Sequence, residues 1–344
     1  MIEGEPYPIK ALFIQGGNPL VNVSNAKNWH KAMKHHLDLL VGMDFWMTPS
    51  LALCDYVLPA ASFLERPHLM VFWGVTDTTM AYKQPMEALY ERKDDYYIWK
   101  ELAKRCELPG EWPDTLEGLF DLYLGKSGFT HKELAERDEF WLSPAPHFHN
   151  YEKYGFGTPS GKVEFLPSIL EAAGVDPMPD YEDRTQSPTK TPELAKEYPY
   201  YLLSGLRIRP WWHSQHRQLK SLRWMHDYPV VEIHPETARK HNIANGEMVY
   251  IETPLGRVRQ KARITSEIRP DTVSAEAYWY FPEMPEEEPY LFGVWDTNIN
   301  AIISDEYEDC NFSGDNPYKA CLCKIYKADT ALDYDSPVAP KIEE

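Results

Sequence analysis

The stretch Tyr200-Tyr201-Leu202-Leu203-Ser204-Gly205-Leu206-Arg207 begins as an apolar, aromatic β-strand and ends in a polar loop that contains a glycine. Similar strand patterns follow at residues 230–233, 248–253, 256–264, 272–275 and 320–326. Turn sequences such as Asn245-Gly246 separate these strands, and one helix is predicted from Pro235 to His241. Six short strands with a single helix predict a compact β-barrel of about 130 residues.

Three polar clusters interrupt this strand-rich region and together predict a binding surface. Gly205 lets a backbone approach a ligand closely, and Arg207 and Lys319 offer positive charge to phosphate. Hydroxyl and amide side chains in the clusters can bond to heterocycle edges or sugar hydroxyls. We therefore expect a large polyanionic ligand. The clusters are residues 204–207 leading to His213-Ser214-Gln215, residues 298–300 ending at Asn300, and Ser313-Gly314 with Tyr318-Lys319.

The first 60 residues alternate short strands with helices. A strand at residues 11–15 runs into Gly16-Gly17-Asn18-Pro19, a second at residues 37–43 ends at Asp44, and a third covers residues 55–59. This alternation predicts a parallel sheet whose ligands lie at the carboxyl ends of the strands, where Asn18 and Asp44 fall. Three strands are fewer than the roughly five or six of a typical sheet. We therefore expect an incomplete, Rossmann-like α/β domain.

The middle of the chain is mainly helical and ends in a polar segment. Helices are predicted at residues 96–105 and 115–124, and a turn at residues 158–162 precedes a strand at residues 163–165. Residues 176–199 are rich in Pro, Asp, Thr and Lys, which is typical of a linker. The predicted organisation is a partial α/β domain at residues 1–175, a linker at 176–199, a barrel at 200–330 and a tail at 331–344.

Charge and cysteine content narrow the possible partners. The formal net charge of the 344 residues is -18, which argues against nucleic acid and leaves a phosphate-bearing ligand to a local basic pocket. The five cysteines form no C-x-x-C pair, so neither zinc nor a disulfide framework is indicated, and Cys321 and Cys323 are expected to be core thiols. No apolar run is long enough for a membrane span. The chain as it stands is expected to be soluble and cytoplasmic, without direct membrane insertion.

Simpler explanations compete for several conspicuous residues of the barrel region. His213 and His216 form an H-x-x-H pair, but such a pair without a third ligand is usually coincidence. Trp211-Trp212 and Trp224 can pack in a core, or they can stack on a ligand beside Arg207, and the sequence leaves both open. Ser204 is close to His213, but no serine lies in a Gly-x-Ser-x-Gly elbow, which disfavours a hydrolase.

Taken in order, these stretches resemble the C-terminal portion of the molybdopterin oxidoreductase family, the molybdenum or tungsten enzymes that are similar to dimethyl sulfoxide reductase. The resemblance covers nearly the whole chain. It rests on Gly16-Gly17-Asn18-Pro19, on Asp44 through Thr48 to Asp55-Tyr56-Val57-Leu58-Pro59 with Glu65 beyond, on Thr158-Pro159-Ser160-Gly161-Lys162-Val163-Glu164-Phe165, and on the barrel from Tyr200 to Lys327. It implies a double-psi-type barrel that binds a dinucleotide.

The resemblance also implies a cofactor and contact residues for it. Family members hold the metal between two molybdopterin guanine dinucleotides. Asn18, Asp44 and Asp95 correspond to contacts near a nucleotide end, where a carboxylate suits the donor edge of guanine. Arg66 corresponds to a position that is often basic. The contacts implied in the barrel region are Gly205, Arg207, His213, Ser214 and Gln215 against pterin and phosphates, and Phe292, Asn300, Tyr318 and Lys319 towards the C-terminus.

The departures from the family pattern limit what this chain does alone. Relatives carry the iron–sulfur cysteine motif and the metal-ligand residue in an N-terminal portion that has no counterpart here, so we assign no catalytic and no metal-ligating residue. We expect a missing N-terminal catalytic portion as partner, with an iron–sulfur electron-transfer subunit as a second candidate, and no cofactor in the isolated chain. A complete enzyme could also be periplasmic. The alternatives are a non-catalytic subunit that complements a separate N-terminal half, and an inert remnant.

The subfamily is suggested by two stretches. Residues 211–217 and 320–324 are most similar to the branch that contains thiosulfate and polysulfide reductases, acetylene hydratase and catechol dehydroxylases. This resemblance leaves both redox and non-redox chemistry open.

Overall fold

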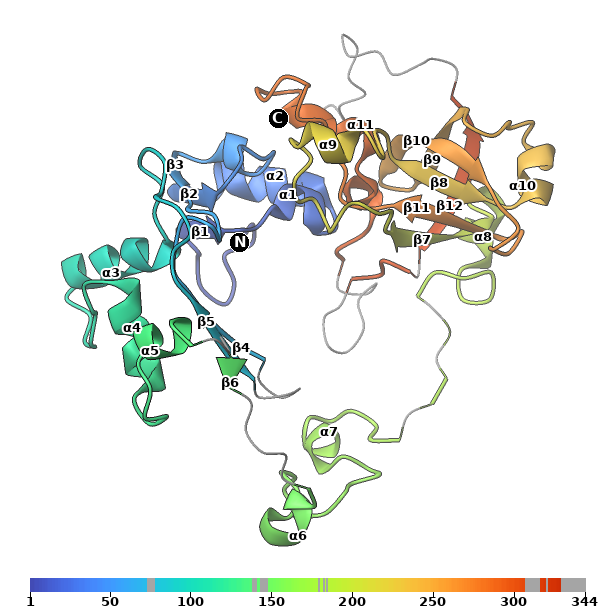
Figure 1. The fold of residues 1–344 in the computed structure, drawn as a ribbon. Coiled ribbons are helices and arrows are strands. Elements are labelled where there is room, and N and C mark those ends of the chain that lie inside the picture. Colours follow the sequence, from blue (N-terminus) through green and yellow to red (C-terminus); the bar gives the residue numbers. More distant parts are fainter. Residues whose placement is uncertain are drawn as a thin grey trace. The chain divides into compact units, whose positions relative to one another are not determined.

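A computed structural model describes residues 1–72, 78–137, 141–142, 148–178, 180–181, 183, 185–306, 316–319 and 321–328 (Figure 1). Ser313-Gly314, Cys310 and the predicted tail lie outside the described residues. The chain divides into two compact units. The first comprises Met1–Gly42, Trp46–Val57 and Asp180–Glu344, and the second comprises Met43–Phe45 and Leu58–Pro179.

The barrel of the first unit is closed by six strands. They lie in the order β10-β8-β11-β7-β12-β9, so neighbours in the barrel are mostly distant in sequence (Figure 1). The β10/β8 and β11/β7 pairs are parallel and the other pairs antiparallel. The six-stranded barrel predicted from the sequence is thereby confirmed. The strands are β7 (Tyr200–Leu206), β8 (Val230–Ile233), β9 (Met248–Thr253), β10 (Gly256–Ile264), β11 (Thr272–Glu276) and β12 (Cys321–Lys327).

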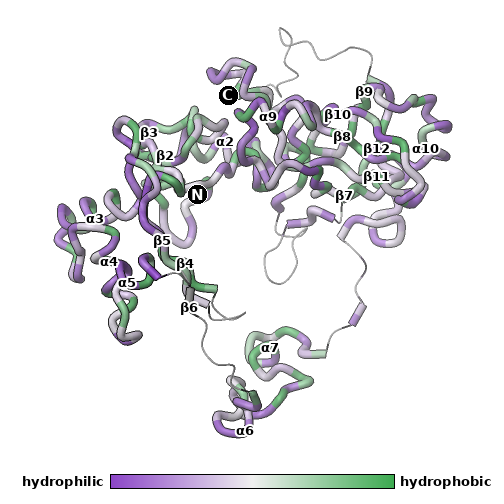
Figure 2. The backbone as a smooth tube through the Cα atoms, viewed as in Figure 1, coloured by the Kyte–Doolittle hydropathy of each residue, from purple (hydrophilic) through white to green (hydrophobic). Residues whose placement is uncertain are grey.

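The barrel core follows from the apolar pattern of its strands. Figure 2 shows hydrophobic stretches along several of these strands. Leu202, Ile251, Val273 and Cys323 are fully buried in one hydrophobic cluster. Burial raises the pKa of the Cys323 thiol, which keeps it protonated and unreactive. The prediction that Cys321 and Cys323 are core thiols is confirmed, since both are buried.

Short helices pack around the barrel and carry polar contacts into its core. Arg259 on β10 forms a buried ion pair with Asp296, its Nε lying 2.9 Å from Oδ1. Gln260 is fully buried and donates to the carbonyls of Glu276 and Thr297. These contacts attach the turn after β11 and the helices that follow to the barrel wall. The helices are α8 (Pro192–Glu197), α9 (Lys220–Arg223), α10 (Pro235–Lys240), η2 (Leu291–Gly293), α11 (Val294–Thr297) and η3 (Ile299–Ile302).

A small parallel sheet is formed near the N-terminus in the order β1-β2-β3. Hydrogen bonds join the same ends of neighbouring strands, from Leu39 N to Lys10 O at 3.1 Å and from Asp55 N to Leu40 O at 2.9 Å. This parallel arrangement confirms the sequence prediction. The elements are β1 (Ala11–Gln15), α1 (Pro19–Asn22), α2 (Ala26–His35), β2 (Leu39–Asp44), η1 (Leu51–Leu53) and β3 (Tyr56–Pro59).

Within the first unit, the N-terminal helices pack against the barrel. Leu20 and Val21 on α1 are completely buried in the barrel's own hydrophobic cluster. Their carbonyls accept hydrogen bonds from the side chains of Asn298 and Asn300, at 3.3 and 2.9 Å. The helix α1 is therefore held beside η3.

The second unit contains a small antiparallel sheet that the sequence did not predict. Its strands have the order β4-β5-β6, and β4 pairs with β5 from His68–Tyr82 to Val71–Thr79. Tyr96, Leu116 and Phe120 form one small buried cluster among the helices. The elements are β4 (His68–Val71), β5 (Thr79–Tyr82), α3 (Asp95–Arg105), α4 (Leu116–Leu124), α5 (His131–Ala135), β6 (Trp141–Leu142), α6 (Asn150–Tyr154) and α7 (Ser168–Ala172).

Two local predictions differ from the structure. Residues 163–165 form no strand, because no described segment pairs with them and Phe165 is 88% exposed. The segment predicted as a linker contains α8, which begins with proline at its first position, and Glu197 near its end pairs with Lys324 on β12. Among the described residues, no helix is long and apolar enough to cross a membrane.

Glu65 leads to a prediction about acid stability in the second unit. Its carboxylate is almost fully buried and accepts hydrogen bonds from Ser62 N, Leu89 N and Arg92. These bonds, foremost that from Ser62, lower the pKa of Glu65 from 4.5 to about 2. A carboxylate with a depressed pKa stabilises the fold above its unfolded pKa, and this contribution is lost as pH falls through the folded pKa.

We therefore expect Glu65→Gln to destabilise the chain at pH 7 and to have progressively less effect between pH 4.5 and about 2. Urea unfolding of parent and variant at a series of pH values measures the difference. Glu133→Gln is a suitable control, because the Glu133 pKa is also lowered but this group lies at an exposed helix start. An equal loss for Glu65→Gln at pH 7 and pH 3 would contradict the expectation.

Candidate functional site

The backbone at Gly205 opens towards free space. Ala275 pairs with Ser204 and Glu276 pairs with Leu206, so Gly205 is an unpaired bulge residue between β7 and β11. Its φ is +143°, and no heavy atom lies within 4 Å of the position that a Cβ would occupy. A ligand can therefore approach the main chain at this point more closely than a side chain would permit.

Aromatic and basic side chains are stacked beside this opening. The His213 ring stacks on Tyr278 at 4.8 Å, Trp212 contacts the His213 ring edge to face, and Arg207 lies over Trp212 at 5.1 Å. Burial and the Arg207 charge lower the pKa of His213, so its imidazole is neutral at pH 7. The stack offers a guanidinium, flat rings and an uncharged imidazole to one region of space.

The structure shows which of the three tryptophans are buried in a core and which are exposed and able to stack on a ligand. Trp211 is only 7% exposed and packs on Trp279, so it belongs to a core. Trp212 is 60% exposed and lies next to Arg207, which makes it the residue suited to stacking on a ligand. Trp224 is 84% exposed. The two neighbouring tryptophans thus have different roles.

Tyr318 and Asn300 link the barrel to α1 and α2. The main chain and side chain of Ser204 both donate to the Tyr318 carbonyl, at 2.9 and 2.7 Å, and the Tyr318 hydroxyl accepts from Ser24 N at 3.1 Å. Asn300 is 1% exposed, and its side-chain amide donates a hydrogen bond to the Val21 carbonyl. Tyr318 therefore lies next to Gly205, whereas Asn300 supports the segment behind it.

The remaining predicted barrel contacts differ in accessibility. Ser214 is buried, whereas Gln215 and Lys319 are exposed. Phe292 is buried with a positive φ of 56°, and its carbonyl accepts from Phe281 N at 2.7 Å. These positions remain predicted cofactor contacts.

Asn18 is held by a serine that the sequence did not single out. The Asn18 Oδ1 accepts from the Ser50 hydroxyl at 2.7 Å, and Ser50 in turn accepts from Leu20 N at 3.0 Å. Both residues are buried, and the Asn18 amide nitrogen donates to no described group. Ser50 follows Asn18 by 32 positions, so only the fold reveals the contact.

Within the second unit, three predicted contacts share one neighbourhood. Asp44 accepts from Ala60 N through its carbonyl, and Ala60 pairs with Lys93, just before α3. Arg66 donates to Asp94 at 2.8 Å, and Asp94 caps the helix whose first residue is Asp95. The structure therefore brings Asp44, Arg66 and Asp95 to the start of α3.

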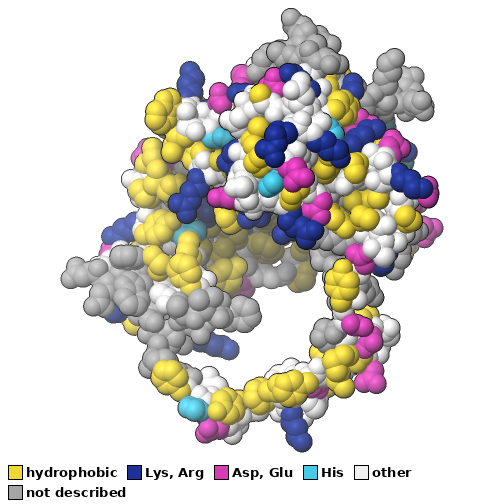
Figure 3. All heavy atoms as spheres, turned by 90° about the vertical axis from the view of Figure 1, so that its right-hand side faces the viewer, with side chains coloured by type: hydrophobic (Ala, Val, Ile, Leu, Met, Phe, Trp, Pro, Cys, Tyr) yellow, Lys and Arg dark blue, Asp and Glu magenta, His cyan; other side chains and the backbone are white. Residues whose placement is uncertain are grey.

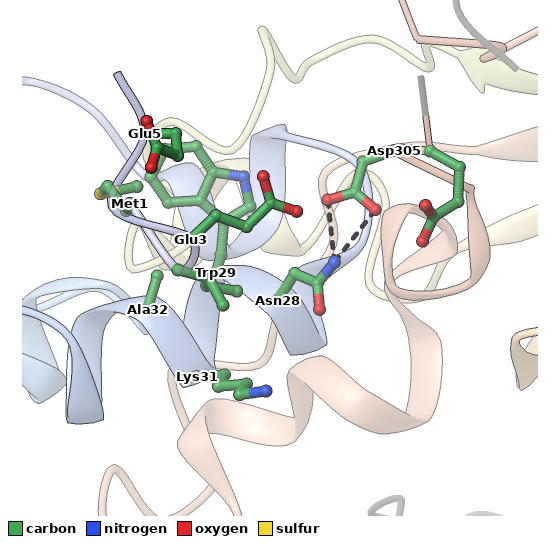
Figure 4. A pocket seen from close by; sticks show the side chains of 10 residues that line it. Met1, Glu3, Glu5, Asn28, Trp29, Lys31, Ala32 and Asp305 are labelled. Carbon is green, nitrogen blue, oxygen red and sulfur yellow. Dashed lines mark hydrogen bonds between the residues drawn. The ribbon is translucent and has the colours of Figure 1, made fainter. Parts of the chain in front are cut away.

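A cavity of about 650 Å³ in the first unit does not suit a polyanion (Figure 4). Its lining includes the carboxylates of Glu3, Glu5, Asp305 and Glu306. Asn28 points towards Asp305 and donates to both of its oxygens at 3.1 Å. These acidic groups would repel phosphate, so the barrel opening at Gly205 is the better candidate for a nucleotide.

The described residues carry mixed surface charge and no cluster of metal ligands. The face drawn in Figure 3 carries Lys and Arg side chains dispersed among acidic and hydrophobic ones, so a polyanion there depends on a local pocket. In the described part of the chain, no three His, Cys, Asp or Glu side chains come together as a metal site. His213 and His216 thus find no third ligand among those residues.

Comparison with known families identifies both parts of the chain. Residues 3–105 match the molybdopterin oxidoreductase model, and residues 201–322 match the molydopterin dinucleotide binding domain. The acetylene hydratase of Syntrophotalea acetylenica is 37% identical over 261 residues, covering 75% of this chain and 35% of that protein. The dopamine dehydroxylase of Eggerthella lenta is 26% identical and covers 95% of this chain and 39% of its own length.

A solved structure gives the same result. The acetylene hydratase from Pelobacter acetylenicus superposes with a TM-score of 0.87 at 32% identity, over 94% of this chain and 45% of that one. The chain thus spans less than half of the length of these relatives. In this family the dinucleotide-binding domain takes molybdopterin guanine dinucleotide with molybdenum. The chain belongs to the molybdopterin oxidoreductase family, and its six-stranded barrel is the molybdopterin dinucleotide-binding domain.

Proposed function

We propose that this chain binds molybdopterin guanine dinucleotide at the barrel opening and forms the cofactor-binding part of an anaerobic molybdenum or tungsten oxidoreductase. The observation that carries the proposal is the free space above the bulged Gly205, beside Arg207 and the exposed Trp212. A phosphate needs close access to main-chain N–H groups and a positive charge, and both are present there. The strand pairing supports a double-psi barrel.

The residues present fit this cofactor. The opening at Gly205 accommodates a bulky group. Arg207 is an exposed cation two residues further along, and Lys319 is an exposed cation that follows Tyr318, whose carbonyl is bonded to Ser204. In the second unit, taken by itself, Asp44 and Asp95 lie at the start of α3 and supply carboxylates of the kind that accept from guanine. We infer two dinucleotides per metal, as the family resemblance implies, together with an incomplete Rossmann-like sheet domain. When bound, the metal cofactor supplies the reaction chemistry, and these residues bind and orient it.

Catalysis would require a further part. We propose that an N-terminal portion, encoded in the same or a separate reading frame, supplies the metal ligand and any iron–sulfur cluster, and that an iron–sulfur subunit can serve as electron partner. The relatives include a hydratase, a dehydroxylase and a thiosulfate reductase. The reaction of the complete enzyme can therefore be either a hydration or a reduction. A second candidate is a non-catalytic cofactor-binding subunit that complements a separate N-terminal half.

The proposal is tested first by metal and nucleotide analysis after anaerobic expression, alone and with the candidate N-terminal partner. We expect the chain alone to be empty, and the complex to contain molybdenum or tungsten with about two guanine nucleotides per metal. Stoichiometric metal in the chain alone would contradict the expected incompleteness. A folded complex without metal or nucleotide would favour the non-catalytic subunit.

A titration with GDP, which carries the guanine, ribose and diphosphate, tests the location of the site. Gly205→Ala places a methyl group in the opening and is expected to weaken GDP binding about tenfold. Gly246→Ala is the matched control, because Gly246 also has positive φ and open space but lies in the turn before β9. Equal affinities for the two variants would place the site elsewhere.

A further inference from the structure

A buried arginine joins the predicted cofactor loop to the segment after β11. Arg217 is 1% exposed, and one of its terminal nitrogens donates to the carbonyls of His213 and Tyr278, each at 3.2 Å. These carbonyls belong to the two residues whose rings stack beside the opening. A single side chain therefore connects both halves of that stack through their main chains.

The guanidinium is enclosed by indole rings, and the nearby Glu276 carboxylate favours its charged form through space without a direct ion pair. It lies 4.5 Å from the Trp211 ring and 4.1 Å from the Trp279 ring, in a cation–π sandwich. No carboxylate of the described residues lies within ion-pair distance, and its Nε and second terminal nitrogen have no hydrogen-bond partner there. Burial lowers the pKa of Arg217 to about 9, which leaves it charged at neutral pH.

A buried charge without a direct ion pair destabilises a core, even though the nearby Glu276 carboxylate attracts this guanidinium. Apolar residues of similar volume often replace buried charged groups without loss of stability, and a methionine would fit between two indoles. Simple packing therefore does not account for an arginine here. Its distinguishing ability is to bond to two main-chain carbonyls that are 65 residues apart in sequence, since His213 and Tyr278 belong to different segments.

The carbonyls that it binds belong to strained backbone. His213 and Tyr278 have φ values of 50° and 65°, in the left-handed region that non-glycine residues rarely adopt. Such conformations persist only where surrounding contacts enforce them. The arginine supplies such a contact at both positions, next to the Ser214 and Gln215 main chain.

We propose that Arg217 is a positioning residue that holds the loop His213-Ser214-Gln215 in its ligand-binding conformation. The role rests on the proposed function, because the loop is the part that would contact pterin and phosphates. Arg217 itself does not touch the ligand. The loop then already adopts its binding-competent conformation before the ligand arrives. The apparent affinity for the ligand is therefore not reduced by the free energy of ordering the loop.

The test compares Arg217→Met with Arg223→Met in the full chain. Arg223 lies over the same Trp279 ring at 5.3 Å, but it pairs with Glu283, and among the described residues it forms no hydrogen bond to the loop. We expect Arg217→Met to keep a Tm close to that of the parent, to increase amide hydrogen exchange at Ser214 and Gln215, and to weaken GDP binding about tenfold. Arg223→Met is expected to change neither exchange in the loop nor GDP affinity.

The two readouts separate the inference from the proposed function. Unchanged exchange and unchanged GDP affinity in a folded Arg217→Met variant would overturn the positioning role. If the parent itself binds no GDP, the proposed function fails, and the exchange measurement on the free chain still decides whether Arg217 orders the loop. If Arg217→Met fails to fold, its role is general packing and the inference is wrong.

Discussion

Replacing Asp296 by alanine is expected to lower the free energy of unfolding by about 3–5 kcal/mol, because it leaves the buried Arg259 guanidinium without its counter-ion. Arg259 and Asp296 are 1% and 3% exposed, and Nε and a terminal nitrogen both lie 2.9 Å from Oδ1. Burial raises the pKa of Asp296, although Arg259 opposes this shift. Removing only one member of the pair therefore leaves an uncompensated buried charge and lowers the stability of the fold. Urea unfolding followed by tryptophan fluorescence measures the loss.

The double variant Arg259→Met with Asp296→Leu is the control for this experiment. It removes both charges and both desolvation penalties, so its stability is expected to approach that of the parent. A double variant as unstable as Asp296→Ala would show that shape at this position, and not the unpaired charge, causes the loss. An Asp296→Ala variant as stable as the parent would contradict the expectation directly.

Arg207→Glu is expected to weaken GDP binding about a hundredfold with little change in stability. Arg207 is exposed, so the fold loses little, but a carboxylate near a diphosphate replaces attraction with repulsion that costs several kcal/mol. The substitution also removes the guanidinium from the Trp212 ring, 5.1 Å away. Calorimetric titration with GDP at low and moderate salt measures the effect, which should shrink as salt screens the charges.

Arg209→Glu is the matched control, because Arg209 is also exposed and lies only two residues further along. It changes the net charge by the same amount but does not stack on Trp212 in the structure. We expect a change in GDP affinity of less than about threefold, from long-range charge alone. If both variants weaken binding equally, the effect is one of net charge, and Arg207 has no specific role.

Much of the architecture could be predicted because its signals are local. The barrel strands follow from short apolar and aromatic runs bounded by turn sequences, as at residues 200–203, and the small parallel sheet follows from strands ending in Gly16-Gly17-Asn18 and Asp44. The predicted strand at residues 163–165 failed because pairing requires a neighbouring strand, which alternation within one segment cannot supply. The short antiparallel sheet of β4, β5 and β6 was missed for a related reason, since its strands are only two to four residues long.

The candidate site was only partly accessible to sequence reasoning. Gly205 and Arg207 were singled out by residue type, and their openness and exposure agree with a ligand role that remains a proposal. Asn300 has an obvious hydrogen-bonding group, but the fold commits its amide to Val21, 279 residues away. Residue type indicates what a side chain can bind, whereas the position of its partners decides what it does bind.

The sequence by itself determined the strands of the barrel, the parallel order of the N-terminal sheet and the family, because apolar strand runs and short motifs act over a few neighbouring residues. Only the tertiary structure decided that Trp211 is core and Trp212 is exposed, that Ser50 holds Asn18, and that Arg217 joins His213 to Tyr278. The physical reason is that burial and hydrogen-bond partners depend on how distant segments pack together, as for Asn18 with Ser50, 32 positions apart, and Arg217 with Tyr278, 61 positions apart.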